Sequence, residues 1–114
     1  MVVRFWSART TVERFPEYLR HFRNHVLPHL RSVEGFREAR VITQSDTVVV
    51  HFIVETVWSS FEAVDRFAGP DRDAAVVAEE ALELLTSYDR RVQHFCVDLY
   101  EAQSSAASSS SASQ

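Results

Sequence analysis

The segment Val48–Ala68 reads VVVHFIVETVWSSFEAVDRFA and contains the strongest structural signal in the chain. An apolar run typical of a β-strand ends at Trp58, and a helix start follows at once. Ser59 is the candidate N-cap residue, with Glu62 three positions later as its capping-box partner. Phe67 and Gly69 then close the helix. The segment therefore predicts a strand that passes directly into a capped helix.

Apolar periodicity in the rest of the chain predicts an α+β fold of the ferredoxin-like βαββαβ order, an antiparallel sheet with helices on one face. Thr10 and Thr11 are candidate caps for the first helix, which Pro28 should kink or interrupt. Ser45 and Asp46 predict a tight turn between two strands. The predicted strands span about 2–9, 36–44, 47–58 and 91–100, and the predicted helices span about 12–33, 60–68 and 71–87.

Length and composition predict one domain over residues 1–101 and a disordered Ser/Ala-rich tail over 102–114. The net charge is −4, and the arginines are scattered among 16 acidic residues, so no nucleic-acid-binding face is expected. No apolar run approaches the ~20 residues that cross a membrane, and no segment is typical of a signal peptide. The single cysteine, Cys96, is interpreted as a small buried hydrophobe, and is consistent with a cytoplasmic location.

Glycine is scarce, because the chain contains only Gly35 and Gly69. A phosphate-binding loop for NAD, FAD or ATP needs several closely spaced glycines. The sequence therefore excludes nucleotide binding through those motifs, and no cofactor is predicted.

The strand predicted over 47–58 is apolar on both of its alternating faces. Helices can cover only one face of so small a sheet, whereas a strand with one wet face should alternate. A second copy of the sheet is the simplest cover for the other face. The sequence therefore predicts a homodimer that associates through the sheet.

A set of spaced residues resembles the antibiotic biosynthesis monooxygenase family. The matched positions are Arg4, Trp6, Gly35, Trp58, Ser60, Phe67, Gly69, Val92 and His94. The resemblance implies the dimeric α+β barrel fold. It also implies cofactor-independent oxygenation of phenols or anthrones, in which the substrate is deprotonated and its anion passes an electron to O₂.

The catalytic sets of the family are not carried over with the fold. For the oxygenases the aligned positions are Val54, Trp58, Val64 and about Ala78, of which only Trp58 matches. For the heme-degrading relatives they are about Ser7, Phe67 and Val77, and none matches. The resemblance therefore disfavours heme degradation and leaves any catalytic residues to be sought elsewhere.

Histidines are the main candidates for chemistry. His94 is a candidate general base or, alternatively, a structural residue, and His51 is interpreted as structural. His21, His25 and His29 are spaced four apart on the first helix, where a pair could bind a metal, but no further ligands are evident and no metal is predicted. A helical wheel places His29 near the apolar face, His25 at its edge and His21 further out.

Two hypotheses follow from these residues. One is a monooxygenase for an aromatic or polyketide-like molecule bound between the first helix and the sheet, with His94 or His25 as base and Arg4 as charge stabiliser. Its predicted binding residues are Trp6, Tyr18, Phe22, His29, Trp58 and Phe67. The other is a dimeric domain without catalysis that binds a hydrophobic metabolite or acts as a scaffold.

Overall fold

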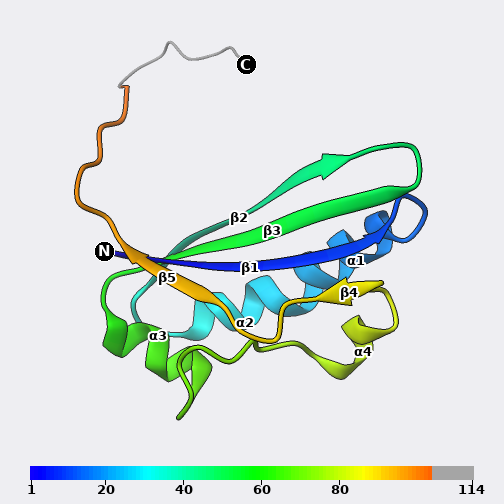
Figure 1. Cartoon of the computed structure of the whole chain (residues 1–114). Helices are drawn as coiled ribbons and strands as arrows, with labels where there is room; N and C mark the ends of the chain where they lie inside the picture. The colour runs from blue at the N-terminus through cyan, green and yellow to red at the C-terminus, as the bar shows by residue number, and fades with distance from the viewer. Residues whose placement is uncertain (104–114) are drawn as a thin grey trace.

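Three long antiparallel strands form the centre of the sheet in the computed structural model, which describes residues 1–103 (Figure 1). The strand order is β2-β3-β1-β4, and β5 pairs with β1 on the same side as β4. The strands are β1 (Val2–Thr11), β2 (Phe36–Ser45), β3 (Val49–Trp58), β4 (Ser87–Tyr88) and β5 (Gln93–Cys96). This confirms the predicted ferredoxin-like α+β fold.

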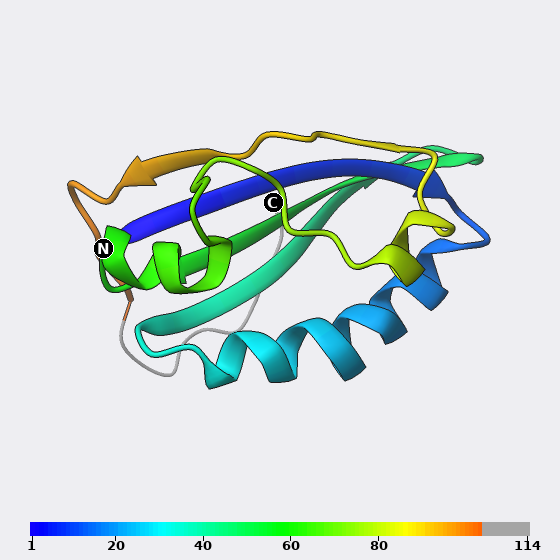
Figure 2. The same ribbon diagram turned by 90° about the horizontal axis from the view of Figure 1, so that it is seen from below.

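The helices lie together on one face of the sheet (Figure 2). They are α1 (Phe15–His21), the π-helix η1 (Phe22–Val26), α2 (Leu27–Ser32), α3 (Phe61–Ala68) and α4 (Glu79–Leu82). The first three are continuous, and together they form the long helix that the sequence predicts. Between them and β3 lies a core whose largest fully buried side chains include Trp58, Phe52 and Leu30.

The π-helical turn explains why the helical wheel was wrong. The backbone N–H of Leu27 bonds to the carbonyl of Phe22, five residues back, just before Pro28. In a straight α-helix, positions four apart drift by about 40° around the axis. A π-helical turn contains more residues than an α-helical turn, so it offsets this rotation. As a result His21 is buried, whereas His25 and His29 are exposed, the reverse of the predicted order.

Two helix starts differ from the prediction by local hydrogen bonding. The cap of α3 is Ser60 rather than Ser59, because the Ser60 Oγ accepts a hydrogen bond from the Ala63 N–H at 3.2 Å. Glu62 then lies one position too early for a capping box. The first helix begins only at Phe15, since Thr10 and Thr11 still belong to β1.

The helix predicted over residues 71–87 is mostly absent. Only Glu79–Leu82 is helical, and Ser87–Tyr88 is a strand. Its first part runs as an irregular segment, residues 70–78, which contains one turn closed by the Ala74 N–H and the Asp71 carbonyl and otherwise bonds to other elements. The last strand is also shorter than the predicted 91–100, and Cys96 on it is exposed rather than buried.

The face of the sheet away from the helices carries several apolar side chains. β3 alternates between buried and half-exposed residues, and its outward set includes Ile53 and Val57 with Glu55 between them. On the neighbouring strands Val3 pairs with Val57 and with Phe95, Phe5 pairs with Glu55, and Phe95 is 54% exposed. We call these five apolar residues the outer apolar face.

Most of the predicted tail, residues 104–114 of 102–114, lies outside the described residues. Within residues 1–103, no helix has the length and apolar character needed to span a membrane.

Candidate functional site

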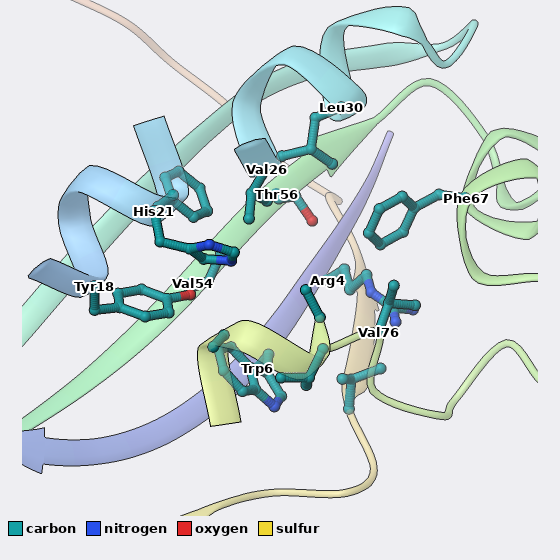
Figure 3. Close-up of a pocket in the computed structure, with 15 residues that line it drawn as sticks. Arg4, Trp6, Tyr18, His21, Val26, Leu30, Val54, Thr56, Phe67 and Val76 are labelled. Atoms are coloured by element: carbon teal, nitrogen blue, oxygen red, sulfur yellow. The ribbon is translucent and has the colours of Figure 1, made fainter. Parts of the chain in front are cut away.

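A small, partly open cavity lies between the helical layer and the sheet (Figure 3). Its volume open to the centre of a water molecule is about 60 Å³, enough for a few waters. The sheet contributes Arg4, Trp6, Val54, Thr56 and Val92, and the long helix contributes Tyr18, His21, Phe22, Val26 and Leu30. The remaining wall consists of Phe67, Val76, Val77, Ala78 and Ala81.

Arg4 is the one cationic residue in the lining, and only 4% of its surface is exposed. Its guanidinium donates to the carbonyls of Arg72 at 2.7 Å and Ala74 at 2.9 Å, and lies 3.0 Å from Nε2 of His94. Burial lowers the Arg4 pKa to about 10, against the opposing charge of Asp73, so the group stays protonated at neutral pH. A guanidinium has five N–H donors, so two are left beyond these three contacts.

The helix side of the cavity presents two neutral polar groups, the hydroxyl of Tyr18 and the ring of His21. Burial raises the pKa of Tyr18, so the phenol keeps its proton. Burial, and next the neighbouring His25, lower the pKa of His21 below its ordinary value, while Glu80 acts in the opposite direction. Among residues 1–103, neither Tyr18 nor His21 makes a side-chain hydrogen bond, so both are free to bind a ligand.

Thr56 connects the cavity to the core behind it. The Nε1 of Trp58 donates to the Thr56 hydroxyl oxygen at 2.9 Å, and the Trp58 ring lies 5.4 Å from that of Phe67. Trp58 itself does not line the cavity, but it fixes two residues that do.

The cavity brings together five of the residues that the sequence singled out: Arg4, Trp6, Tyr18, Phe22 and Phe67. The others lie elsewhere.

His25 and His29 are exposed, with His29 packed against the outer side of Phe67 at 5.6 Å between rings. His94 lies behind Arg4, between Arg4 and Asp73. His21 was missed, and no signal other than the helix-interrupting Pro28 could have indicated it.

Solved structures with the same arrangement of strands and helices are numerous, although no family model and no curated protein sequence matches the chain. A Bacillus cereus protein assigned to the antibiotic biosynthesis monooxygenases is similar at 15% identity and a TM-score of 0.64, over 90% of this chain and 97% of its own. The heme degrader MhuD of Mycobacterium tuberculosis, with two hemes in its active site, is similar at 23% identity and 0.62, over 90% and 100%.

A third similar structure is the monooxygenase ActVA-Orf6 of Streptomyces coelicolor in complex with nanaomycin D. It is 19% identical, with a TM-score of 0.59, over 92% of each chain. The chain has the antibiotic biosynthesis monooxygenase fold. The resemblance found in the sequence is thereby confirmed for the architecture.

Four of the seven positions aligned with catalytic residues of antibiotic biosynthesis monooxygenases line this same cavity. Val54 and Ala78 line it, as do Phe67 and Val77, but each carries an apolar side chain. Ser7 points to the other side of the sheet, where its hydroxyl lies 2.7 Å from Nε2 of His51. The polar groups of this cavity therefore occupy positions different from those of the family sets.

Proposed function

We propose that this protein is a monooxygenase that oxidises an aromatic, polyketide-like small molecule in the cavity without a bound cofactor. The observation that supports the proposal is the lining itself. Aromatic rings from four elements, Trp6, Tyr18, Phe22 and Phe67, line a space that also contains a buried cation and a neutral imidazole. Apolar walls with a few convergent polar groups are typical of small-molecule sites.

The proposed reaction is oxygenation of an activated methylene, as in the conversion of an anthrone to an anthraquinone. The anthrone reacts through its phenolic tautomer, whose hydroxyl group loses a proton to give an electron-rich anion. The anion passes one electron to O₂, the two radicals join through a C–O bond, and the peroxide anion takes up a proton. Loss of water from the resulting hydroperoxide leaves the carbonyl, so one oxygen atom enters the product and the substrate supplies the electrons. Arg4 stabilises the anion, because a cation in an enclosed apolar site acts more strongly than in water.

The wall formed by Val76–Ala78 is the proposed entrance. At about 60 Å³ the cavity is too small for a fused aromatic ring system, so part of the wall has to move. Among the described residues, neither Val76 nor Val77 makes a backbone hydrogen bond, and Val76 is 49% exposed. Segments with few such bonds open at low cost in free energy.

The proposal includes a homodimer through the outer apolar face. Val3, Phe5, Ile53, Val57 and Phe95 lie on the face that the helices of the same chain do not cover, with Glu55 among them opposite Phe5. Patches of that kind on small domains are typical of interaction sites.

The alternative is a dimeric domain that binds a hydrophobic metabolite or acts as a scaffold, without catalysis. The apolar replacements at Val54, Ala78 and Val77 favour it, since the family's catalytic side chains are absent there. Binding without oxygen uptake would distinguish it from the monooxygenase.

The experiment is oxygen uptake with 1,8-dihydroxyanthrone and a panel of dihydroxynaphthalenes, with no cofactor added. We expect uptake above the autoxidation rate that heat-denatured protein does not produce. Quenching of Trp6 fluorescence measures binding in parallel, and the Trp6→Phe variant identifies the signal. Binding without uptake across the panel supports the alternative, and neither binding nor uptake argues against both.

A further inference from the structure

We propose that His21 accepts the proton of an acidic aromatic hydroxyl group bound in the cavity and releases it to solvent through His25. The proposal rests on the function proposed above, because it names the chemical class of the ligand and the group that deprotonates it.

His21 lies at the boundary between the cavity and the protein surface. Figure 3 shows its ring directed into the cavity between Tyr18 and Val26. The same residue also lines a groove on the outside, together with His25 and Glu80. The ring centroids of His21 and His25 are 5.4 Å apart, and His25 is exposed. Among the described residues, His21 alone lines both spaces.

No other lining residue can take up a proton near neutral pH. Arg4 has only donors, and it stays protonated at a pKa of about 10. Tyr18 keeps its proton because burial raises its pKa. Trp6 donates its Nε1–H to the carbonyl of Asp89, and Thr56 carries a hydroxyl that does not titrate. A neutral imidazole is therefore the available base.

The charges around His21 allow a proton to be held briefly and then lost. His25 on the same helical stretch disfavours the imidazolium, and Glu80, at the start of α4, favours it. Further out in the groove lie the charged groups of Glu17, Arg20 and Glu83. A positive charge formed on His21 thus has a favourable carboxylate charge in the same groove, and an exposed histidine beside it.

The proton transfer balances without any further reactant. The O–H bond of the ligand breaks, an N–H bond forms on the unprotonated ring nitrogen of His21, and the phenolate shares the cavity with the Arg4 cation. The proton then moves to His25 and to water, and His21 returns to its neutral form. Tyr18, next to His21, has a free hydroxyl that can donate to the phenolate.

The first test uses 4-nitrophenol, whose ionised form alone absorbs in the visible. Near pH 6, bound 4-nitrophenol should be ionised several-fold more than the free compound in wild type. His21→Gln should bind it within about threefold of the wild-type affinity, without the added ionisation. Equal ionisation in the two proteins, or no binding to wild type, would overturn the proposal.

A second measurement needs no variant of His21. The proton NMR titration of the histidine rings should show two resonances with a lowered pKa, those of His21 and His94, and the one that persists in His94→Gln should shift on addition of 4-nitrophenol. If the His21 ring has an ordinary pKa and its resonance does not respond to the ligand, the proposal is contradicted. This outcome can be read even where His21→Gln fails to fold.

Oxygen uptake separates this proposal from the monooxygenase itself. If oxygen uptake is the same in wild type and in His21→Gln, the proposed role of His21 is wrong and the monooxygenase proposal is retained. If ligand ionisation depends on His21 but wild type shows no oxygen uptake, the role of His21 is retained and the monooxygenase proposal is wrong.

The release of the proton through His25 is tested with His25→Gln. This variant should turn over more slowly in dilute buffer, and added imidazole should restore its rate. The exposed His29→Gln, outside both the cavity and the groove, is the matched control. Equal turnover of the two variants in dilute buffer would overturn the role of His25.

Discussion

The guanidinium Nη1 of Arg4 lies 3.0 Å from Nε2 of His94. Because an arginine has no acceptor, Nε2 must accept this hydrogen bond, and the proton of the neutral ring is on Nδ1. Nδ1 in turn lies 3.2 Å from a carboxylate oxygen of Asp73, to which it donates. His94 is therefore held in one tautomer, with its lone pair directed at Arg4 rather than at the cavity.

Acid should destabilise the protein because of this arrangement. Burial, and next the charge of Arg4, lower the pKa of His94 below 6.5, although Asp73 opposes the shift. The pKa of His21 is lowered as well. A folded-state pKa below the unfolded value means that the unfolded chain binds protons more readily. The melting temperature should therefore hold above about pH 7 and fall as the pH drops through 6.5.

Melting curves between about pH 8 and pH 5 measure this dependence. His94→Gln, whose amide can accept from Arg4 and donate to Asp73, should flatten part of the slope. A melting temperature that stays level or rises on acidification would contradict the assignment.

Removing the Arg4 side chain should release the irregular segment over the cavity. Arg4→Met leaves the carbonyls of Arg72 and Ala74 without their donor, and we expect a loss of about 2–4 kcal/mol in the free energy of unfolding. Trypsin should also cleave faster after Arg72. Urea unfolding measures the first effect and timed digestion the second.

The matched control for Arg4 is Arg9→Met, at an exposed position on the same strand. It should change the free energy of unfolding by no more than about 0.5 kcal/mol. Similar losses in the two variants would mean that Arg4 contributes no specific anchoring.

The contacts of Arg4 also show why part of the fold could not be predicted from the sequence. Local patterns were sufficient for the strand that ends at Trp58 and for the amphipathic first helix. They failed over 71–87, where Ala, Glu and Leu favour a helix but bonds from Arg4 and Val92 hold the backbone in another path. Tyr18 and Phe22 were foreseeable from helical spacing, and Trp6 and Phe67 from the family resemblance. His21 depends on a π-helical turn that spacing does not encode.

The cap of α3 can be tested with two adjacent serines. Ser60→Ala removes the side-chain acceptor of the Ala63 N–H and should cost about 1 kcal/mol of stability. Ser59→Ala retains the bond from the Ser59 backbone N–H to the Gly35 carbonyl, so it should cost less. Chemical denaturation of both proteins compares them, and a larger loss for Ser59→Ala would reverse the assignment.

Gly35 should tolerate no side chain. Its φ is +97°, and an added Cβ would lie 2.4 Å from the Cβ of Ala63 and 2.8 Å from the Oγ of Ser59. Gly35→Ala should therefore cost about 3 kcal/mol or more, from backbone strain and from the clash with α3. Gly69→Ala, at φ +84° with no atom within 4 Å, should show the strain alone. Equal losses in thermal unfolding would show that the contact with Ala63 relaxes freely.

The outer apolar face leads to a prediction about assembly. Phe95 is 54% exposed in the single chain and packs edge-on against Phe5 at 5.6 Å, so Phe95→Lys should leave the folded chain intact. In a dimer the same lysine would be buried without a partner, so the dissociation constant of the dimer should rise at least about tenfold. Val48→Lys, 63% exposed just before β3, adds the same charge outside the face and should have no effect. Sedimentation over a range of concentrations measures the mass, and a wild-type protein that stays at 13.1 kDa throughout would remove the dimer from the proposal.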